Sequence, residues 1–223
     1  AASAQASVLA DWAAAPNGTS IAAMGVAAGL TADDLTRGPG LNQAGGATFN
    51  SNSWDAGADA ASALANGNYL SWGINGLVAG EISDMEIRID VSGTGPDFYE
   101  IFASTDGFST SNSIFFFDTA GNTQGVDHNI LTPSLSNITG GVEFRLVGWG
   151  ATSPNGTMDI ETIDFANGGT YGIRLNGNPL PPPASAALLG LGGLGAARRR
   201  REAGGKRPGS PRTSEAHAER DLI

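Results

Sequence analysis

The chain of 223 residues contains no cysteine and only two histidines, His128 and His217. Without cysteine the protein has neither a disulfide framework nor a thiol nucleophile. A nucleophilic triad or a zinc site needs histidine among its partners, and His128 lies alone in a stretch of Gly, Asp and Asn. The G-x-S-x-G motif of many serine hydrolases is also missing. The sequence therefore offers no triad and no histidine-ligated metal centre.

Positive charge is scarce as well. Residues 1–197 contain no lysine and only four arginines, Arg37, Arg88, Arg145 and Arg174. The tail from Arg198 onward carries eight basic and four acidic residues, which leaves residues 1–197 with a net charge of −14. A body of that charge repels phosphates, so we expect no nucleic-acid partner. The same charge suits a solvated extracellular surface.

Long apolar runs are missing before residue 184, whereas glycine is abundant, with 33 residues in the chain. Short apolar runs between Gly, Asn, Ser and Thr are typical of all-β proteins. Residues 85–91 and 142–149 alternate between apolar and polar side chains, which predicts strands with one face on a core and the other in water. Further strands are expected at 19–28, 69–74, 98–104, 114–117, 158–165 and 170–175.

Helical signals are few. Thr31 followed by Asp33 and Asp34 predicts a capped helical turn, and residues 59–65 predict a short helix. No segment between the strands is long enough for a crossover helix, so the strands are expected to pair in antiparallel fashion. The predicted fold is all-β: a jelly-roll-like antiparallel β-sandwich over residues 18–177.

The two ends of the chain differ from this body. Residues 1–6 are small, in a pattern like the end of a signal peptide, so we interpret 1–17 as the leader of a mature exported protein. Residues 178–201 form a second segment, and 202–223 are expected to be disordered. In the second segment, prolines at 179–183 are followed by small apolar residues at 184–197 and then by Arg198, Arg199, Arg200 and Arg201.

Counted from Pro179, the apolar segment approaches the roughly 20 residues that cross a bilayer. The arginines place its end on the cytoplasmic side by the positive-inside rule. A buried core helix would not contain four glycines or be followed by four arginines. The segment is therefore predicted to be a transmembrane-type helix.

Pro179, Leu180 and Pro181, followed by the apolar segment and the arginines, resemble the PEP-CTERM sorting signal of exported Gram-negative proteins, in its V-P-L-P-A variant. Asn178 and Pro182 depart from that motif. Four stretches of this chain's body also resemble stretches common in these exported proteins, namely residues 34–41, 48–54, 104–108 and 142–150.

This resemblance implies a route for the protein. Such tails enter the inner membrane and are cut by exosortase, a membrane transpeptidase, which would release the body to the cell surface or the extracellular matrix. The family is linked to exopolysaccharide and biofilm, so the resemblance implies extracellular polysaccharide as a partner.

Sugar binding would use exposed aromatic rings together with polar groups. The candidates are Trp54, Trp72, Tyr99 and Trp149, with Arg145 as a scarce cation. Trp54 lies in a predicted loop and is the ring most expected to be exposed. Trp72 and Trp149 follow alternating strands and also fit a core position. Arg37 is expected to pair with a nearby acidic group.

Two other chemistries remain open. Loops containing Asp106, Asp118, Asn122 and Asp127 offer the hard oxygen ligands that Ca²⁺ prefers, although the same residues often only stabilise turns. Paired carboxylates could hydrolyse glycans. The candidates are Glu86, Glu100, Glu143 and Glu161. Each lies in the polar phase of a predicted strand, where a solvated face is expected.

The sequence thus favours an exported surface or matrix protein without catalytic activity, with carbohydrate binding as its activity. A secreted glycan-acting hydrolase and a purely structural matrix protein are the alternatives. A binding protein should expose aromatic rings on one face, and a hydrolase should hold two carboxylates about 5–10 Å apart in a cleft. A structural protein should show neither feature.

Overall fold

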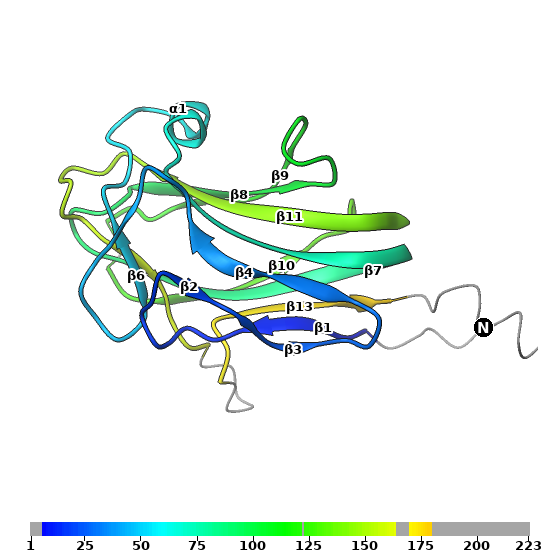
Figure 1. Ribbon diagram of the computed structural model, residues 1–223. Helices are drawn as coiled ribbons and strands as arrows, with labels where there is room; N and C mark the ends of the chain where they lie inside the picture. Colours follow the sequence, from blue (N-terminus) through cyan, green and yellow to red (C-terminus); the bar gives the residue numbers. More distant parts are fainter. Residues whose placement is uncertain (1–5, 122, 164–169, 180–223) are drawn as a thin grey trace, which may run out of the picture. The chain divides into compact units, whose positions relative to one another are not determined.

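The computed structural model describes residues 6–121, 123–163 and 170–179 (Figure 1). Within them, antiparallel strands form two facing sheets, which confirms the predicted antiparallel β-sandwich. Figure 1 shows β8 and β11 in one layer and β1, β3 and β13 in the other. No helix in these ranges is long and apolar enough to cross a membrane. Leu180, Pro181, the apolar segment and Arg198–Arg201 lie outside the described residues.

Sheet B is the layer that carries the candidate site. Its strands are, in spatial order, β2 (Ser20–Ile21), β4 (Thr31–Arg37), the first half of β7 (Tyr69–Val91), β11 (Ile138–Trp149), β8 (Phe98–Ser104) and β9 (Asn112–Asp118).

Sheet A lies on the other side of the core. Its main strands are, in order, β3 (Ala23–Val26), β1 (Ser7–Trp12), β13 (Ile173–Asn178), the second half of β7 and β10 (Val126–Leu131). Next to the end of β7 the sheet continues through β12 (Met158–Ile160), β6 (Phe49–Asn52) and β5 (Asn42–Gln43).

Strand β7 belongs to both sheets. The sequence predicted two separate strands, at 69–74 and 85–91, but the structure has one strand of 23 residues. Gly76 and Ala79 have positive φ angles of 91° and 51°, and the register with β11 shifts twice next to them. Such irregularities bend a strand and increase its twist, so the second half of β7 can pair in the opposite sheet.

The core lies between the inner faces of the two sheets. The alternation predicted for residues 85–91 is confirmed, because Met85, Ile87, Ile89 and Val91 are buried. On sheet B, Trp72 stacks on Phe144 with ring centroids 5.8 Å apart. Burying one large apolar side chain stabilises a fold by roughly 1.5–3 kcal/mol, so the buried faces of these strands stabilise the sandwich.

The predicted leader is partly a strand. Ser7–Trp12 forms β1, which pairs with β13 and β3, and Leu9, Ala10 and Trp12 are buried. The domain boundary predicted at residue 18 is therefore wrong. The strand is covered from both sides, because β13 and β3 pair with it. At the other end, β13 stops at Asn178, immediately before Pro179.

Two predictions about local structure had opposite outcomes. The helix expected at 59–65 is confirmed as α1 (Ala60–Ala65), whose first turn is capped by the Asp59 side chain accepting from Ser62 N at 2.8 Å. The helical turn expected near Thr31 is wrong, since residues 31–37 form β4. Pairing with β7 on one side and β2 on the other outweighs the local capping signal there.

Candidate functional site

Cross-strand pairing decides which side chains share the outer face of sheet B. Residues directly opposite one another on antiparallel strands point to the same face. Counting across β7, β11 and β8, the successive rows on this face are Gly73–Glu143–Ser104, Ser71–Arg145–Phe102 and Tyr69–Val147–Glu100. The first of these rows contains only small or polar side chains, and aromatic side chains begin in the second.

Arg145 is held between two aromatic rings. Its guanidinium carbon lies 3.8 Å from the ring centre of Phe108 and 4.4 Å from that of Tyr69. Its Nε also donates to Glu143 Oε1 at 2.9 Å. A cation over an aromatic face contributes about 0.5–1 kcal/mol at an exposed site. The stack therefore orients the Glu143 carboxylate.

The loop that carries Phe108 is fixed by its own hydrogen bonds. Phe108 N donates to Ser104 Oγ at 2.9 Å, and Thr110 N donates to Asp106 Oδ1 at 2.9 Å. Ser104 Oγ donates in turn to Asp106 Oδ1 at 2.8 Å. These bonds hold the Asp106 carboxylate in its ionised form, so its pKa is lowered. Phe108 is thereby held over Arg145 despite a positive φ of 64°.

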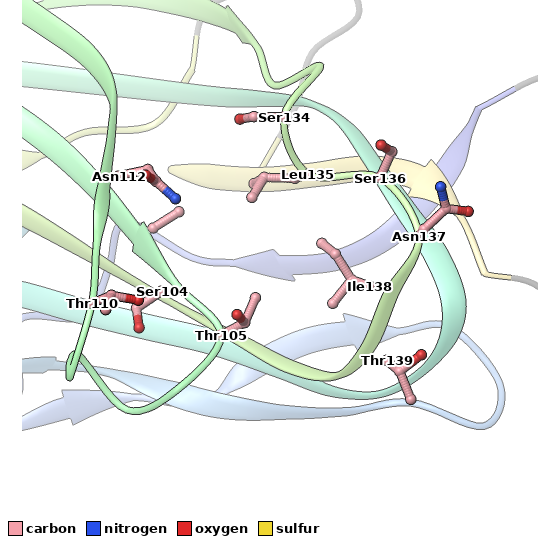
Figure 2. Close-up of a pocket in the computed structure, with 11 residues that line it drawn as sticks. Ser104, Thr105, Thr110, Asn112, Ser134, Leu135, Ser136, Asn137, Ile138 and Thr139 are labelled. Atoms are coloured by element: carbon pink, nitrogen blue, oxygen red, sulfur yellow. The ribbon is translucent and has the colours of Figure 1, made fainter.

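A groove, formed by three adjoining hollows, runs beside this stack. The first, of about 340 Å³, lies between the β8–β9 loop and the β10–β11 connection. Figure 2 shows Thr105 and Asn112 on one side of it and Leu135 and Ile138 on the other. It shares Ser104 and Thr105 with the second hollow, of about 200 Å³.

The second and third hollows bring the groove onto the outer face of sheet B. They share Asp33 and Glu143, and the third has a volume of about 260 Å³. Asp33 Oδ2 accepts from Asn75 Nδ2 at 3.2 Å. A Cβ added to Gly73, which lies between Asp33 and Glu143 in the same row, would lie 2.8 Å from Asp33 Oδ2. Gly73 therefore leaves open the space beside the Asp33 carboxylate, and Glu143 follows on the other side of it in the same row.

An aromatic platform occupies the other end of the same face. It consists of Phe98, Phe116 and Trp149, whose ring centroids are 5.7–6.2 Å apart. Phe116 is 53% exposed, whereas Trp149 is 6% exposed and packs with Ala63 of α1. The platform therefore presents mainly the Phe116 ring to solvent, supported by the other two rings.

The predicted sugar-binding residues separate into two groups. Arg145 and Trp149 lie on the outer face of sheet B, whereas Trp72 and Tyr99 fill the core. The exposure expected of Trp54 is wrong, because it is 3% exposed and its Nε1 donates to Ser51 O at 2.9 Å. Its loop folds inward, since the glycine at position 148 leaves space for the indole.

Several residues of the candidate site were not predicted. Asp33 was assigned to a helical turn, and Phe116 lies in the run Ile114–Phe117, where every side chain is apolar. Such a run shows no alternation, so its outward ring cannot be recognised from the sequence. Tyr69 could have been recognised from the sequence, because it starts an alternating segment one position before the buried Leu70 and therefore belongs to the outer face.

The predicted calcium ligands are dispersed. Asp106 and Asp118 lie at opposite ends of the β8–β9 hairpin, and each accepts from a nearby backbone N–H. Asp127, on β10, forms an ion pair with Arg88 at 3.0 Å. Asn122 lies outside the described residues. The turn chemistry considered as the alternative accounts for Asp106 and Asp118. Across the residues that the structure describes, no three His, Cys, Asp or Glu residues are grouped as a metal would require.

The four strand glutamates also separate. Glu100 and Glu143 lie on the outer face of sheet B, two rows apart on neighbouring strands, while Glu86 is in sheet A and Glu161 directly follows β12. Arg37 was expected to pair with an acidic group, but it donates to neutral acceptors, including Ser51 Oγ at 2.8 Å and Gly18 O at 2.7 Å. Burial lowers the pKa of Arg37.

A second carboxylate group lies on sheet A, away from the groove. Asp159 is directly opposite Asp90 and accepts a hydrogen bond from Thr48. Burial, and to a smaller extent the charges of Asp90 and Glu161, raises the pKa of Asp159 to about 6. Like charges directly opposite each other destabilise a sheet, so this group costs stability when ionised.

Comparison with known proteins places the chain in no family. No family model and no curated protein matches it. A carbohydrate-binding module of family 29 is similar in structure, with 10% identity and a TM-score of 0.40, over 78% of this chain and 90% of that chain. A variant of such a module complexed with mannohexaose has 9% identity and a TM-score of 0.40, over 78% and 93%.

The K2 cleaved adhesin domain of Lys-gingipain is a further similar structure, with 11% identity and a TM-score of 0.35, over 78% of this chain and 99% of that chain. At such TM-scores these similarities support no conclusion about ligand or activity.

Proposed function

We propose that this protein is a non-catalytic glycan-binding β-sandwich of the cell surface or extracellular matrix, and that the groove on sheet B is its binding site. The observation that carries the proposal is the succession of three adjoining hollows along this surface, each of which shares lining residues with the next. An elongated groove suits a chain ligand such as extracellular polysaccharide better than a compact metabolite.

The lining of the groove matches the chemistry of sugars. Hydroxyl, amide and carboxylate groups line it, including Ser71, Asn75, Thr105 and Asn112. Sugar hydroxyls both donate and accept hydrogen bonds, so they are recognised by a mixture of such groups. The stack of Phe108, Arg145 and Tyr69 holds Glu143, which lines two of the hollows, so this side chain loses less entropy on binding.

A blocking substitution tests the proposal. Thr105 is exposed and lines two of the hollows, so Thr105→Trp should fill the groove. Binding of the full chain to a panel of neutral, amino and uronic oligosaccharides is measured by titration calorimetry. The proposal requires that at least one oligosaccharide binds and that Thr105→Trp weakens it at least tenfold.

The matched control is Thr152→Trp, which adds the same ring at an exposed position beyond the opposite end of β11. It should bind like the wild type. Equal binding by Thr105→Trp and the wild type would overturn the assignment of the groove. A chain that binds no oligosaccharide would overturn glycan binding itself and leave the purely structural matrix protein.

One observation favours a hydrolase as a second candidate. Asp33 and Glu143 lie in one row on either side of Gly73, on strands two positions apart in the sheet, whose backbones are about 9.6 Å apart. Carboxyl groups of glycoside hydrolases are separated by roughly 5–9.5 Å. Release of reducing ends from a bound oligosaccharide, abolished by Glu143→Gln, would support this activity. Binding without release supports the non-catalytic role.

We also propose that the segment 178–201 is a PEP-CTERM-like sorting signal, cut by exosortase after insertion in the inner membrane. Strand β13 ends at Asn178, so cleavage near Pro179–Pro183 would leave every strand of the sandwich intact. The intact mass of the surface form, from a host with the sorting machinery, tests this. A mature chain ending at these prolines supports sorting, and full-length chain in the inner membrane contradicts it.

A further inference from the structure

Strand β9 (Asn112–Asp118) is an open edge of sheet B. In the part of the chain that the structure describes, it pairs with β8 and with no other strand. Every second residue of such an edge strand directs its backbone N–H and C=O groups away from the sheet, where only water satisfies them. The outer side of β9 therefore offers the backbone groups with which a further strand can pair.

The other terminal strands of the two sheets are shorter or carry charge. β2 and β5 have two residues each and β3 has four, whereas β9 has seven. β10, with six residues, contains Asp127, which is ion-paired with Arg88. From Asn112 to Phe117, β9 contains neither a charged residue nor a proline, although these are the usual means of keeping an exposed edge unpaired. Among the described terminal strands, β9 is therefore the least protected.

Both faces of β9 keep apolar surface open at this edge. The register with β8 is regular from Phe115 to Asp118. Phe116 lies on the outer face of sheet B and is 53% exposed. Phe115 and Phe117 lie on the inner face and pack on Tyr99, with 5.1 Å between the ring centroids of Phe117 and Tyr99. Tyr99, one strand further in, is buried, whereas both phenylalanines are only half-buried. A further strand beside β9 would cover these rings as β9 covers Tyr99.

The charge of the protein favours this edge for contact between two copies. Residues 1–197 carry a net charge of −14, so two copies repel each other over most of their surface. The one charge of β9, Asp118, lies at the end of the strand. An antiparallel β9–β9 pair places the two Asp118 residues at opposite ends, whereas a parallel pair would place them side by side. With Phe116 opposite Phe116, the two Asp118 residues are about 14 Å apart along the strands, which exceeds the roughly 8 Å over which physiological salt screens charge.

We propose that two copies of this chain pair β9 with β9 about a two-fold axis, in antiparallel fashion and with Phe116 opposite Phe116. Sheet B then continues through both copies, the outward backbone groups of both edges are satisfied, and the central aromatic pair stabilises the contact. Such a contact uses the same surface on both partners, so it closes as a dimer and does not extend into a fibre. The proposal goes beyond the proposed function, because it does not depend on glycan binding.

Sedimentation equilibrium of the full chain over a range of concentrations measures the association. The mass should rise from that of the 22.6 kDa monomer to twice this value. Phe116→Glu removes the central ring pair and places two like charges opposite each other, so it should weaken the dimer at least about tenfold. The ring is 53% exposed, so the variant should fold, which urea unfolding checks. The matched control Leu131→Glu removes a side chain that is 74% exposed on β10 and should dimerise like the wild type.

Two further measurements distinguish strand pairing from other kinds of association. Backbone N–H groups that become paired exchange their hydrogens more slowly. Hydrogen exchange in residues 112–118 should therefore slow at concentrations where the dimer forms, while exchange in residues 126–131 stays unchanged. Raising the salt concentration should tighten the dimer, because salt screens the repulsion between two bodies of the same charge.

Four outcomes would overturn the proposal. The first is a monomer at every concentration. The second is an association that Phe116→Glu leaves intact or that Leu131→Glu weakens equally, because the contact would then lie elsewhere or be unspecific. The third is an association without slower exchange in residues 112–118. The fourth is an association that salt weakens, which would indicate an ionic contact between the acidic body and the eight basic residues from Arg198 onward. None of these outcomes bears on glycan binding, which Thr105→Trp tests separately.

Discussion

Replacing Asp159 with asparagine should stabilise the sandwich at neutral pH. Asp159 is partly buried on β12, directly opposite Asp90 of β7, and accepts a hydrogen bond from Thr48. Burial is the main cause that raises the pKa of its carboxyl from 3.8 to about 6, and the charges of Asp90 and Glu161 add to it. The folded protein therefore holds a proton that the unfolded chain releases at lower pH.

The sign and size of the effect follow from this difference. Where the folded state binds more protons than the unfolded state, the free energy of unfolding decreases as the pH rises. The contribution of Asp159 is thus favourable below about pH 4 and is lost as the pH rises to about 6. One pKa unit corresponds to 1.36 kcal/mol, so the two-unit shift costs at most about 3 kcal/mol at pH 7.

Asp159→Asn keeps an acceptor for Thr48 but cannot ionise. The measurement is urea unfolding, followed by tryptophan fluorescence, for both proteins between pH 4 and 8. The variant should gain about 1–3 kcal/mol relative to the wild type at pH 7 and little at pH 4. Asp97→Asn, at an exposed position, controls for the loss of one negative charge. A stability difference that does not change with pH, or a less stable variant at pH 7, would refute the reasoning.

Three further outcomes are expected. His128 is buried against Tyr99, with 2.7 Å between its Nε2 and the hydroxyl, and burial lowers its pKa from 6.5 to about 4. The free energy of unfolding should therefore fall by up to about 3 kcal/mol as the pH drops through this range. His128→Gln should flatten that part of the dependence of urea unfolding on pH. Gly73→Ala should lower the free energy of unfolding by about 1–3 kcal/mol, because the added Cβ would lie 2.8 Å from Val142 O. A variant as stable as the wild type would contradict this close approach of β7 and β11. Phe116→Ala should change the free energy of unfolding by less than about 1 kcal/mol, because the ring is 53% exposed. In calorimetric titration it should weaken the binding of any glycan that reaches the aromatic platform. Unchanged binding would limit the site to the groove.

Some of the architecture could be read from local patterns. The strict alternation at 85–91 predicted both the strand and its buried face, because a period of two places successive side chains on opposite sides. Asp59 predicted the start of α1, because its side chain satisfies a backbone N–H that the helix leaves open. Neither prediction required knowledge of a distant part of the chain.

The candidate site could be predicted only in part. Arg145 and Trp149 were recognised as rare or large side chains and do lie on one face, but Trp54 was placed in solvent although it is buried. A loop carries no periodicity, so the direction of its aromatic ring depends on the space left by other segments. For Trp54 that space is left by the glycine at position 148, on a strand almost 100 residues later.

The sequence by itself determined that the protein is all-β, that its body is acidic, and that its composition changes after residue 178, because these properties depend on neighbouring residues alone. The tertiary structure decided which face of each strand is covered and which segments meet. It joined two predicted strands into β7, recruited β1 to sheet A, and placed Asp33 and Glu143 in one row on either side of Gly73. The physical reason is that strand pairing is satisfied by backbone groups, which are identical at almost every residue. The partner of a strand therefore depends on the packing of the whole sandwich rather than on its own sequence.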